Sequence, residues 1–170
     1  MSKTQTIVFT GFLVSLTVLL ARILAIQLPF IRISFEFFPI AIAALLMGPV
    51  IGGITGAVAD VIGASLFASG RFFPGFTISA FLTGIIYGLM LHGRPMSKKR
   101  AFVTALIKTV VVDLVLVTAW LFIMYRTPFP VLLWQRLAKF AVILPLETIF
   151  LYLVAGPLLK VLQKRLSSSP

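Results

Sequence analysis

The chain has 170 residues, of which 60% are hydrophobic and 11% are charged. A typical soluble domain has about 45–50% apolar and about 25% charged residues, so this composition excludes an ordinary soluble protein. With no cysteine, one histidine and four acidic residues, the chain cannot form disulfides or thiolate metal sites and has little material for an acid–base pair. The net charge of +11 indicates a partner only once the cations are placed relative to a membrane.

Six continuous apolar runs follow one another along the chain. At about 20 apolar residues per span, they predict an all-α integral membrane protein with six transmembrane helices in a single domain, residues 1–170. We expect the helices over residues 7–28, 35–47, 50–68, 75–91, 101–125 and 133–162. The runs do not alternate between polar and apolar residues, which disfavours β-structure.

Lysine and arginine are distributed unequally between the two ends of this bundle. With six spans both termini share one side, and that side has eight such residues against three on the other. The eight are Lys3, Arg94, Lys98, Lys99, Arg100, Lys160, Lys164 and Arg165, and the three are Arg32, Arg71 and Arg126. Because cytoplasmic loops have the excess of positive charge, we expect cytoplasmic termini, with the inner cations touching anionic lipid head groups rather than nucleic acid.

Cations also gather at or near the outer end, where Glu36 is the only acidic residue close in sequence. They are Arg22, Arg32, Arg71, Arg126, Arg136 and Lys139. Charge within the hydrocarbon usually faces a cavity or a partner, which favours an anion site, although some of these side chains could instead extend to the outer head groups. In the last run, positions 136, 139, 143 and 147 follow at helical spacing and share one face, which we expect to point into the bundle.

Aromatic residues cluster at the same outer end. They include Phe30, Phe35, Phe73, Phe76, Trp120 and Trp134. An interfacial aromatic belt is one explanation. The inner end has few aromatic residues, however, so a pocket for a flat, anionic ligand is the other explanation, with ring stacking and cation–π contacts for its planar part and arginine for its carboxylates.

Two carboxylates, Asp60 and Asp113, lie near the middle of predicted helices. Pairing with Arg22 or Lys108 is the first interpretation, and a proton-coupled carrier, which also needs a membrane carboxylate, is the alternative. Glycine and other small residues at four-residue steps, as over 52–60 and 80–88, predict close helix packing. A further pair, Gly11 and Ser15, is the candidate for docking another subunit.

Motifs of common enzymes are absent from the sequence. It contains no G-x-x-x-x-G-K-[ST] phosphate loop, no G-x-S-x-G and no H-E-x-x-H, which argues against ATP hydrolysis by this chain and against the corresponding hydrolases. Six spans are also too few for the usual pair of transporter repeats. We therefore expect a binding protein without catalytic residues, metal or cofactor of its own, which takes energy from a partner.

Four stretches of the chain resemble the folate family of substrate-binding (S) components of bacterial energy-coupling-factor (ECF) vitamin transporters. They are residues 20–24 (LARIL), 31–41 (IRISFEFFPIA), the glycine-rich helix that follows Gly48-Pro49, and residues 72–88 (FFPGFTISAFLTGIIYG). The pattern of Arg136 and Lys139 ahead of Pro145 is also similar to the family.

The resemblance implies a six-helix fold that binds folate near the outer face, under a lid formed by the loop between the first two helices. It implies ligand contacts at Arg22, Arg32, Phe35, Phe73, Gly75, Phe76, Thr77, Trp120, Trp134, Arg136 and Lys139. Its implied partners are a membrane coupling subunit, docked near Gly11 and Ser15, and two ATP-binding-cassette ATPases, which use the ATP and magnesium. Thiamin and riboflavin are the alternative ligands.

Overall fold

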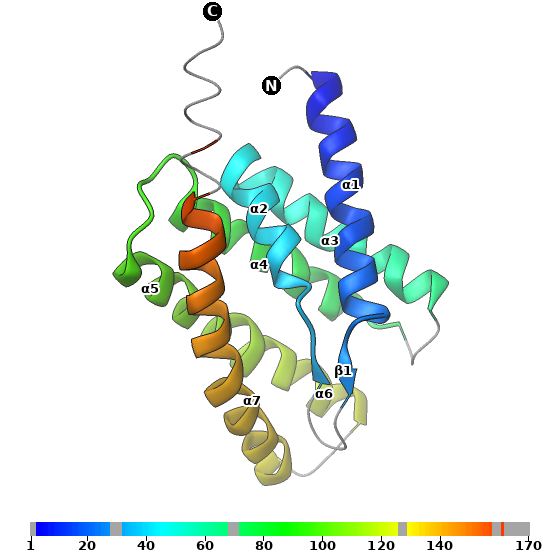
Figure 1. Ribbon diagram of the computed structural model, residues 1–170. Coiled ribbons are helices and arrows are strands. Elements are labelled where there is room, and N and C mark those ends of the chain that lie inside the picture. The colour runs from blue at the N-terminus through cyan, green and yellow to red at the C-terminus, as the bar shows by residue number, and fades with distance from the viewer. Residues whose placement is uncertain (1–2, 28–31, 68–71, 126–128, 158–160, 162–170) are drawn as a thin grey trace, which may run out of the picture.

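The computed structural model describes residues 3–27, 32–67, 72–125, 129–157 and 161 of the chain. Within them, helices dominate, and a short hairpin separates the first two (Figure 1). The elements are α1 (Lys3–Arg22), β1 (Ile26–Gln27), β2 (Arg32–Ile33), α2 (Phe37–Met47), α3 (Pro49–Leu66), α4 (Pro74–Leu91), α5 (Lys98–Lys108), η1 (Thr109–Leu116), α6 (Val117–Tyr125), α7 (Phe129–Phe150) and η2 (Leu151–Ala155). η1 and η2 are π-helical segments, and η1 joins α5 and α6 into one continuous helix.

The first helix is shorter than the sequence predicts. It ends at Arg22 rather than at residue 28, and the chain then forms an antiparallel pair in which Ile26 faces Ile33 and Gln27 faces Arg32. Pro29 lies two residues after Gln27 in sequence, and a proline disfavours the α conformation at the residue that precedes it. The apolar run therefore continues past the end of the helix, and this two-residue pairing lies within an otherwise helical fold.

Helices α2, α3 and α4 pack closely through small residues. A side-chain carbon at Gly52 would meet Ala44 of α2 and the carbonyl of Gly84, and one at Gly84 would meet the backbone of Gly52. Gly56 lies in the same way against the carbonyl of Ala80. These contacts confirm the predicted packing of small residues, since only glycine lets the two backbones approach so closely.

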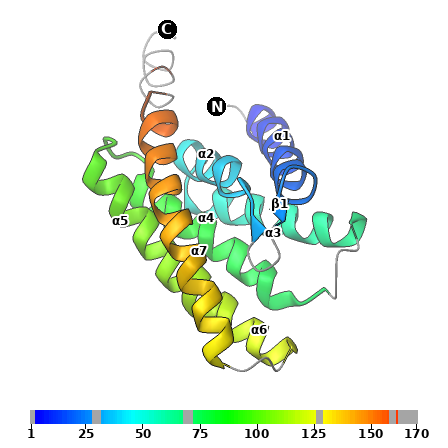
Figure 2. The same ribbon diagram turned by 60° about the horizontal axis from the view of Figure 1, so that its bottom comes forward.

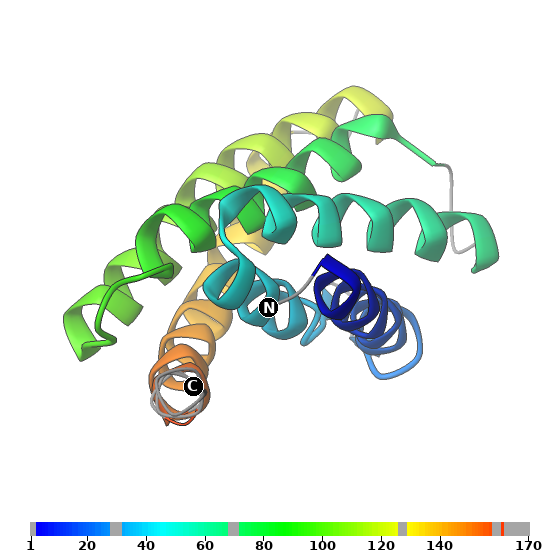
Figure 3. The same ribbon diagram turned by 90° about the horizontal axis from the view of Figure 1, so that it is seen from above.

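The helices form two layers when the molecule is viewed along its length (Figure 3). Helices α1, α2 and α7 lie on one side of α3, α4 and the α5–α6 helix, and α7 runs alongside α5–α6 (Figure 2). The largest buried apolar cluster joins the layers and includes Phe37, Leu45, Tyr87, Leu91 and Ala105.

Four of the described helices are long and apolar enough to cross a membrane: α1, α3, α4 and the continuous helix Lys98–Tyr125. Helix α2 is apolar but has 11 residues, as its short run predicts. Large apolar side chains such as Ile7, Leu66 and Val115 are exposed on the outside of the bundle. Exposed apolar surface on this scale is expected where lipid, rather than water, surrounds the helices.

Candidate functional site

The predicted ligand residues come from the hairpin end of the bundle. Helix α1 ends there at Arg22, and α7 begins there with Arg136 in its second turn (Figure 1). Residues 73–77 at the start of α4 reach the same region, because they contact Arg22's partner on α3 and Trp120 on α6. Three features lie at this end: an aromatic cluster, an arginine–aspartate contact and a hollow.

The aromatic cluster consists of Phe73, Phe76 and Trp120. The ring centroid of Phe73 lies 6.0 Å from that of Phe76 and 5.7 Å from that of Trp120. The indole nitrogen of Trp120 donates a hydrogen bond to the hydroxyl of Ser79, 3.1 Å away. Gly75 is buried below the rings, and a side-chain carbon there would meet both Phe73 and Trp120. Glycine is therefore required for this ring arrangement.

A second contact joins three helices around Asp60. One of its oxygens lies 4.0 Å from Arg22 Nη2, and the other accepts a hydrogen bond from the hydroxyl of Thr77 at 2.7 Å. The guanidinium of Arg22 lies over Gly63, the position where α3 has no side chain. The predicted pairing of Asp60 with Arg22 is confirmed, and it ties the end of α1 to α3 and α4.

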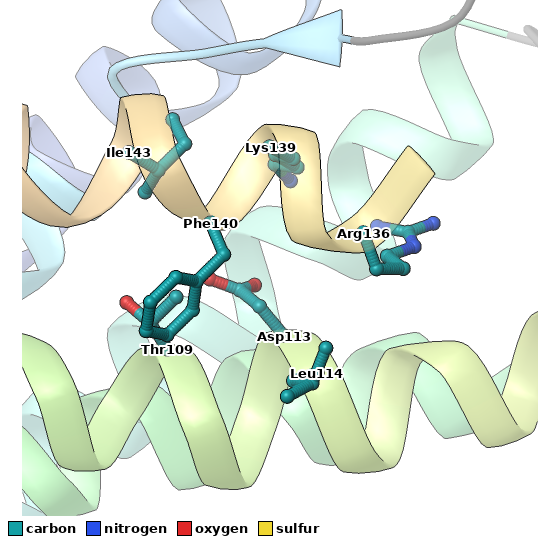
Figure 4. A pocket seen from close by; sticks show the side chains of 7 residues that line it. All are labelled: Thr109, Asp113, Leu114, Arg136, Lys139, Phe140 and Ile143. Atoms are coloured by element: carbon teal, nitrogen blue, oxygen red, sulfur yellow. The ribbon is translucent and has the colours of Figure 1, made fainter. Parts of the chain in front are cut away.

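A small hollow lies between η1 and α7 (Figure 4). Its lining consists of Thr109, Asp113, Leu114, Arg136, Lys139, Phe140 and Ile143, and its empty volume of about 210 Å³ includes space open to solvent. Figure 4 shows the carboxylate of Asp113 pointing toward α7, while the guanidinium of Arg136 extends away from it toward the start of α7. The hollow therefore combines both signs of charge with apolar walls.

A buried polar network supports the carboxylate of Asp113. Lys108 Nζ lies 3.0 Å from Asp113 Oδ2 and 3.1 Å from Glu147 Oε2. The hydroxyl of Tyr87 donates a hydrogen bond to Glu147 Oε1. Glu147 is 0% exposed. The network links α4, α5, η1 and α7, and buried charges are tolerated when they are paired in this way.

Arg136 and Lys139 differ from Lys108. Within the described part of the chain, neither forms an ion pair with a carboxylate at 4.0 Å or less. Both line the hollow, and Ile143 and Glu147 on the same face are buried. This confirms that the face formed by positions 136, 139, 143 and 147 points into the bundle, and it leaves two cations available to an anionic or hydrogen-bond-accepting group.

Several predicted ligand residues are not brought into the aromatic cluster or the hollow. Trp134 is 75% exposed and is not brought together with the other rings. Phe35 packs beside Phe37, with 6.4 Å between ring centroids. Arg32 contributes its backbone to β2, while its side chain and Phe30 lie outside the described residues. Ligand contact by Trp134, Phe35 and Arg32 stays a prediction.

The structure adds residues to the site that the sequence pattern did not indicate. Thr109, Leu114 and Phe140 line the hollow. The predicted pairing of Lys108 with a membrane carboxylate is confirmed at Asp113, and Glu147 is a second partner that was not predicted. Thr109 is 1% exposed and its hydroxyl has no hydrogen-bond partner among the described residues. The sequence signal for the Lys108 network is a lysine within an apolar run, because such a charge needs a buried counter-charge.

The sequence matches a family described as "ECF transporter, substrate-specific component" over residues 5–165. The folate transporter FolT of Clostridium novyi (strain NT) is 39% identical over 152 residues, which cover 89% of this chain and 88% of that protein. The folate transporter FolT of Leuconostoc mesenteroides is 30% identical over 125 residues, covering 73% of this chain and 67% of the relative.

Solved structures show the same fold. A crystal structure of FolT bound with folic acid superimposes with a TM-score of 0.85 at 35% identity, covering 91% of this chain and 96% of that one. The S component of a bacterial ECF transporter gives a TM-score of 0.54 at 21% identity, covering 98% and 97% of the two chains. At that identity the second likeness concerns the fold alone.

Proposed function

Because this chain belongs to the substrate-specific components of ECF transporters, we propose that it binds folate at the hairpin end and delivers it inward as the S component of an ATP-dependent importer. The strongest support is a hollow at the same end as the aromatic cluster. It is lined by Arg136 and Lys139, which form no ion pair with a carboxylate among the described residues. The FolT relatives support folate as the vitamin.

The chemistry of folate fits this arrangement. Folate has a flat pterin, an aromatic linker and a glutamate tail with two carboxylates. Phe73, Phe76 and Trp120 offer ring faces for the flat parts, and guanidinium and ammonium groups pair with carboxylates or carbonyl oxygens. Asp60 and Asp113, on which the proton-coupled alternative depended, each have a cation or hydroxyl partner.

The proposed importer places energy conversion on other subunits. In it a membrane coupling subunit and two ATPases dock on this chain, the ATPases use ATP and magnesium, and this chain has no catalytic residue or cofactor of its own. Both termini face the cytoplasm of a bacterial cell. The α1 surface around Gly11 and Ser15 suits the docking role because both residues are exposed and a side-chain carbon at Gly11 would meet nothing within 4 Å.

Single-tryptophan variants test the binding function. The chain has two tryptophans, so Trp134→Phe leaves Trp120 as the only indole and Trp120→Phe leaves Trp134. We expect saturable quenching of Trp120 fluorescence by folate in purified Trp134→Phe protein, at concentrations at which thiamin and riboflavin give none. Tighter binding of thiamin or riboflavin contradicts the assignment to folate. Quenching in Trp120→Phe protein as well would support the prediction for Trp134.

Replacing Gly11 with leucine is expected to separate binding from transport. The new side chain has space on the exposed face of α1, so folate affinity of the purified chain stays within about twofold. Folate uptake and co-purification of the coupling subunit should fall at least about tenfold, because bulk at a small-residue contact keeps helices apart. Ala141→Leu, which adds the same bulk on an exposed position of α7, is the matched control and should leave uptake unchanged.

A Gly11→Leu variant that transports folate normally, with the coupling subunit still attached, would remove α1 from the docking surface. The folate-binding proposal would stand in that case.

A further inference from the structure

Glu36 differs from the other acidic residues of the chain. Asp60, Asp113 and Glu147 each have a cation or hydroxyl partner. Glu36 is exposed, and it forms no ion pair at 4.0 Å or less with any side chain that the structure describes. It also makes no capping hydrogen bond, although it occupies the N-cap position of α2. The polar contacts that hold the described helices together therefore do not use its carboxylate.

The start of α2 packs against the two helices that form the hollow. Glu36 lies between β2 and α2, directly before Phe37 (Figure 1). The ring centroid of Phe37 lies 5.9 Å from Lys108 Nζ and 5.6 Å from the ring centroid of Phe150. Lys108 directly precedes η1, and Phe150 ends α7. Phe37 therefore anchors the residue before it beside the helices of the hollow.

Glu36 lies within electrostatic range of charged groups on two sides. One is Lys139, a cation of the hollow, and the other is Asp60, the partner of Arg22. Because an unpaired charge is costly in contact with hydrocarbon, we expect its carboxylate to face the opening at this end rather than lipid. Glu36 thus adds a negative charge between the hollow and the contact of Arg22 with Asp60.

A carboxylate at this place opposes the capture of an anion. Arg136 and Lys139 attract the carboxylates of a ligand, whereas Glu36 repels them. Charges interact over about 8 Å at physiological ionic strength, so the repulsion needs no direct contact and acts whichever end of folate enters the hollow. An importer must release its ligand as well as hold it, and weaker binding shortens the residence time of the ligand.

We propose that Glu36 is an affinity-limiting residue: its carboxylate repels the anionic tail of folate at the hairpin end, which weakens binding and speeds release. This inference rests on the proposed binding of folate. It makes the effect of Glu36 depend on the charge of the ligand and not on its shape.

Glu36→Gln tests the inference, because glutamine keeps the size of the side chain and removes its charge. At about 10 mM salt, where the Debye length is about 30 Å, folate should bind this variant about threefold to tenfold more tightly than wild-type protein. At about 1 M salt, where that length is about 3 Å, the gain should fall below about twofold. For folate with both tail carboxylates converted to amides, the two proteins should differ by less than about twofold at either salt concentration.

Two control variants separate charge from shape and from net charge. Glu36→Ala also removes the carboxylate, so we expect the same gain for folate although the side chain is smaller. Thr4→Lys raises the net charge by the same amount at an exposed position near the start of α1. Because that position lies at the other end of α1 from Arg22, folate affinity should stay within about twofold of wild type.

The outcomes distinguish this inference from the proposed function. Unchanged or weaker folate binding by Glu36→Gln at low salt overturns the inference, and so does an equal gain for the diamide, while the proposed function stands in both cases. If wild-type protein binds no folate at either salt concentration, the proposed function itself fails. If Glu36→Gln does not fold, Glu36→Ala decides by the same criteria.

Discussion

Replacing Glu147 with alanine should destabilise the protein by about 3–5 kcal/mol, the cost typical of removing one partner from a buried ion pair. Glu147 is fully buried and accepts from both Lys108 and Tyr87. Its loss leaves the phenol of Tyr87 without a partner and Lys108 with Asp113 alone. The expected result is a marked drop in thermal stability in detergent, measured from the amount of monodisperse protein that survives heating.

Two further variants define the cause of that loss. Glu147→Gln keeps an acceptor for Tyr87 and the side-chain volume but removes the charge, so its stability should lie between those of wild type and alanine. Glu36→Ala removes an exposed acid and should change stability by less than about 0.5 kcal/mol. Equal stability of Glu147→Ala and wild-type protein would contradict the structural role of the network.

Helix positions could be predicted well where one long apolar run lies between proline or glycine residues. The third and fourth helices, expected over 50–68 and 75–91, are found at Pro49–Leu66 and Pro74–Leu91. Proline suits the first turn of a helix, where its missing N–H has no helical partner. The end of α1 was predicted poorly because the pairing of β1 with β2 competes with the helix, and hydropathy does not report that pairing.

Side-chain placement could be predicted where the helix is regular. The face of α7 that contains Arg136 and Glu147 follows from spacings of three and four residues, and the structure confirms it. Lys108 and Asp113 are five residues apart, which puts them on different faces of an α-helix. The π-helical η1 begins at Thr109, and its i to i+5 periodicity brings the two side chains together. A composition pattern does not reveal such a local change of helix type.

Exposure of single aromatic residues was the least predictable feature. Trp120 and Trp134 both lie at the outer end in sequence, yet Trp120 contacts Phe73 and Ser79 whereas Trp134 is 75% exposed. An aromatic residue at the membrane interface and one that lines a pocket are of the same residue type, and both lie near the same end of a predicted helix. What separates them is the rotation of each helix about its axis, which depends on packing against neighbours.

The largest effect on binding is expected from neutralising both free cations of the hollow. Charge-assisted hydrogen bonds contribute about 1.5–3 kcal/mol each, and about 1.4 kcal/mol corresponds to a tenfold change in affinity. The double change Arg136→Gln and Lys139→Gln should therefore weaken folate binding at least about 100-fold. Because neither side chain forms an ion pair with the described residues, the fold should keep its stability.

The matched control is the double change Arg94→Gln and Lys99→Gln. It removes two exposed cations that follow the far end of α4 and lowers the net charge by the same amount. Folate affinity of this control should remain within about twofold of wild type, which shows that position, and not total charge, determines the effect.

Calorimetric titration of folate into the purified wild-type chain, the Arg136/Lys139 variant and the Arg94/Lys99 control tests the account most directly. We expect saturable binding of one folate to the wild-type chain and the control, and a loss of at least about 100-fold in the Arg136/Lys139 variant at unchanged thermal stability. Equal folate affinity in all three proteins, or no folate binding by the wild-type chain, would contradict a folate site at the hairpin end of this bundle.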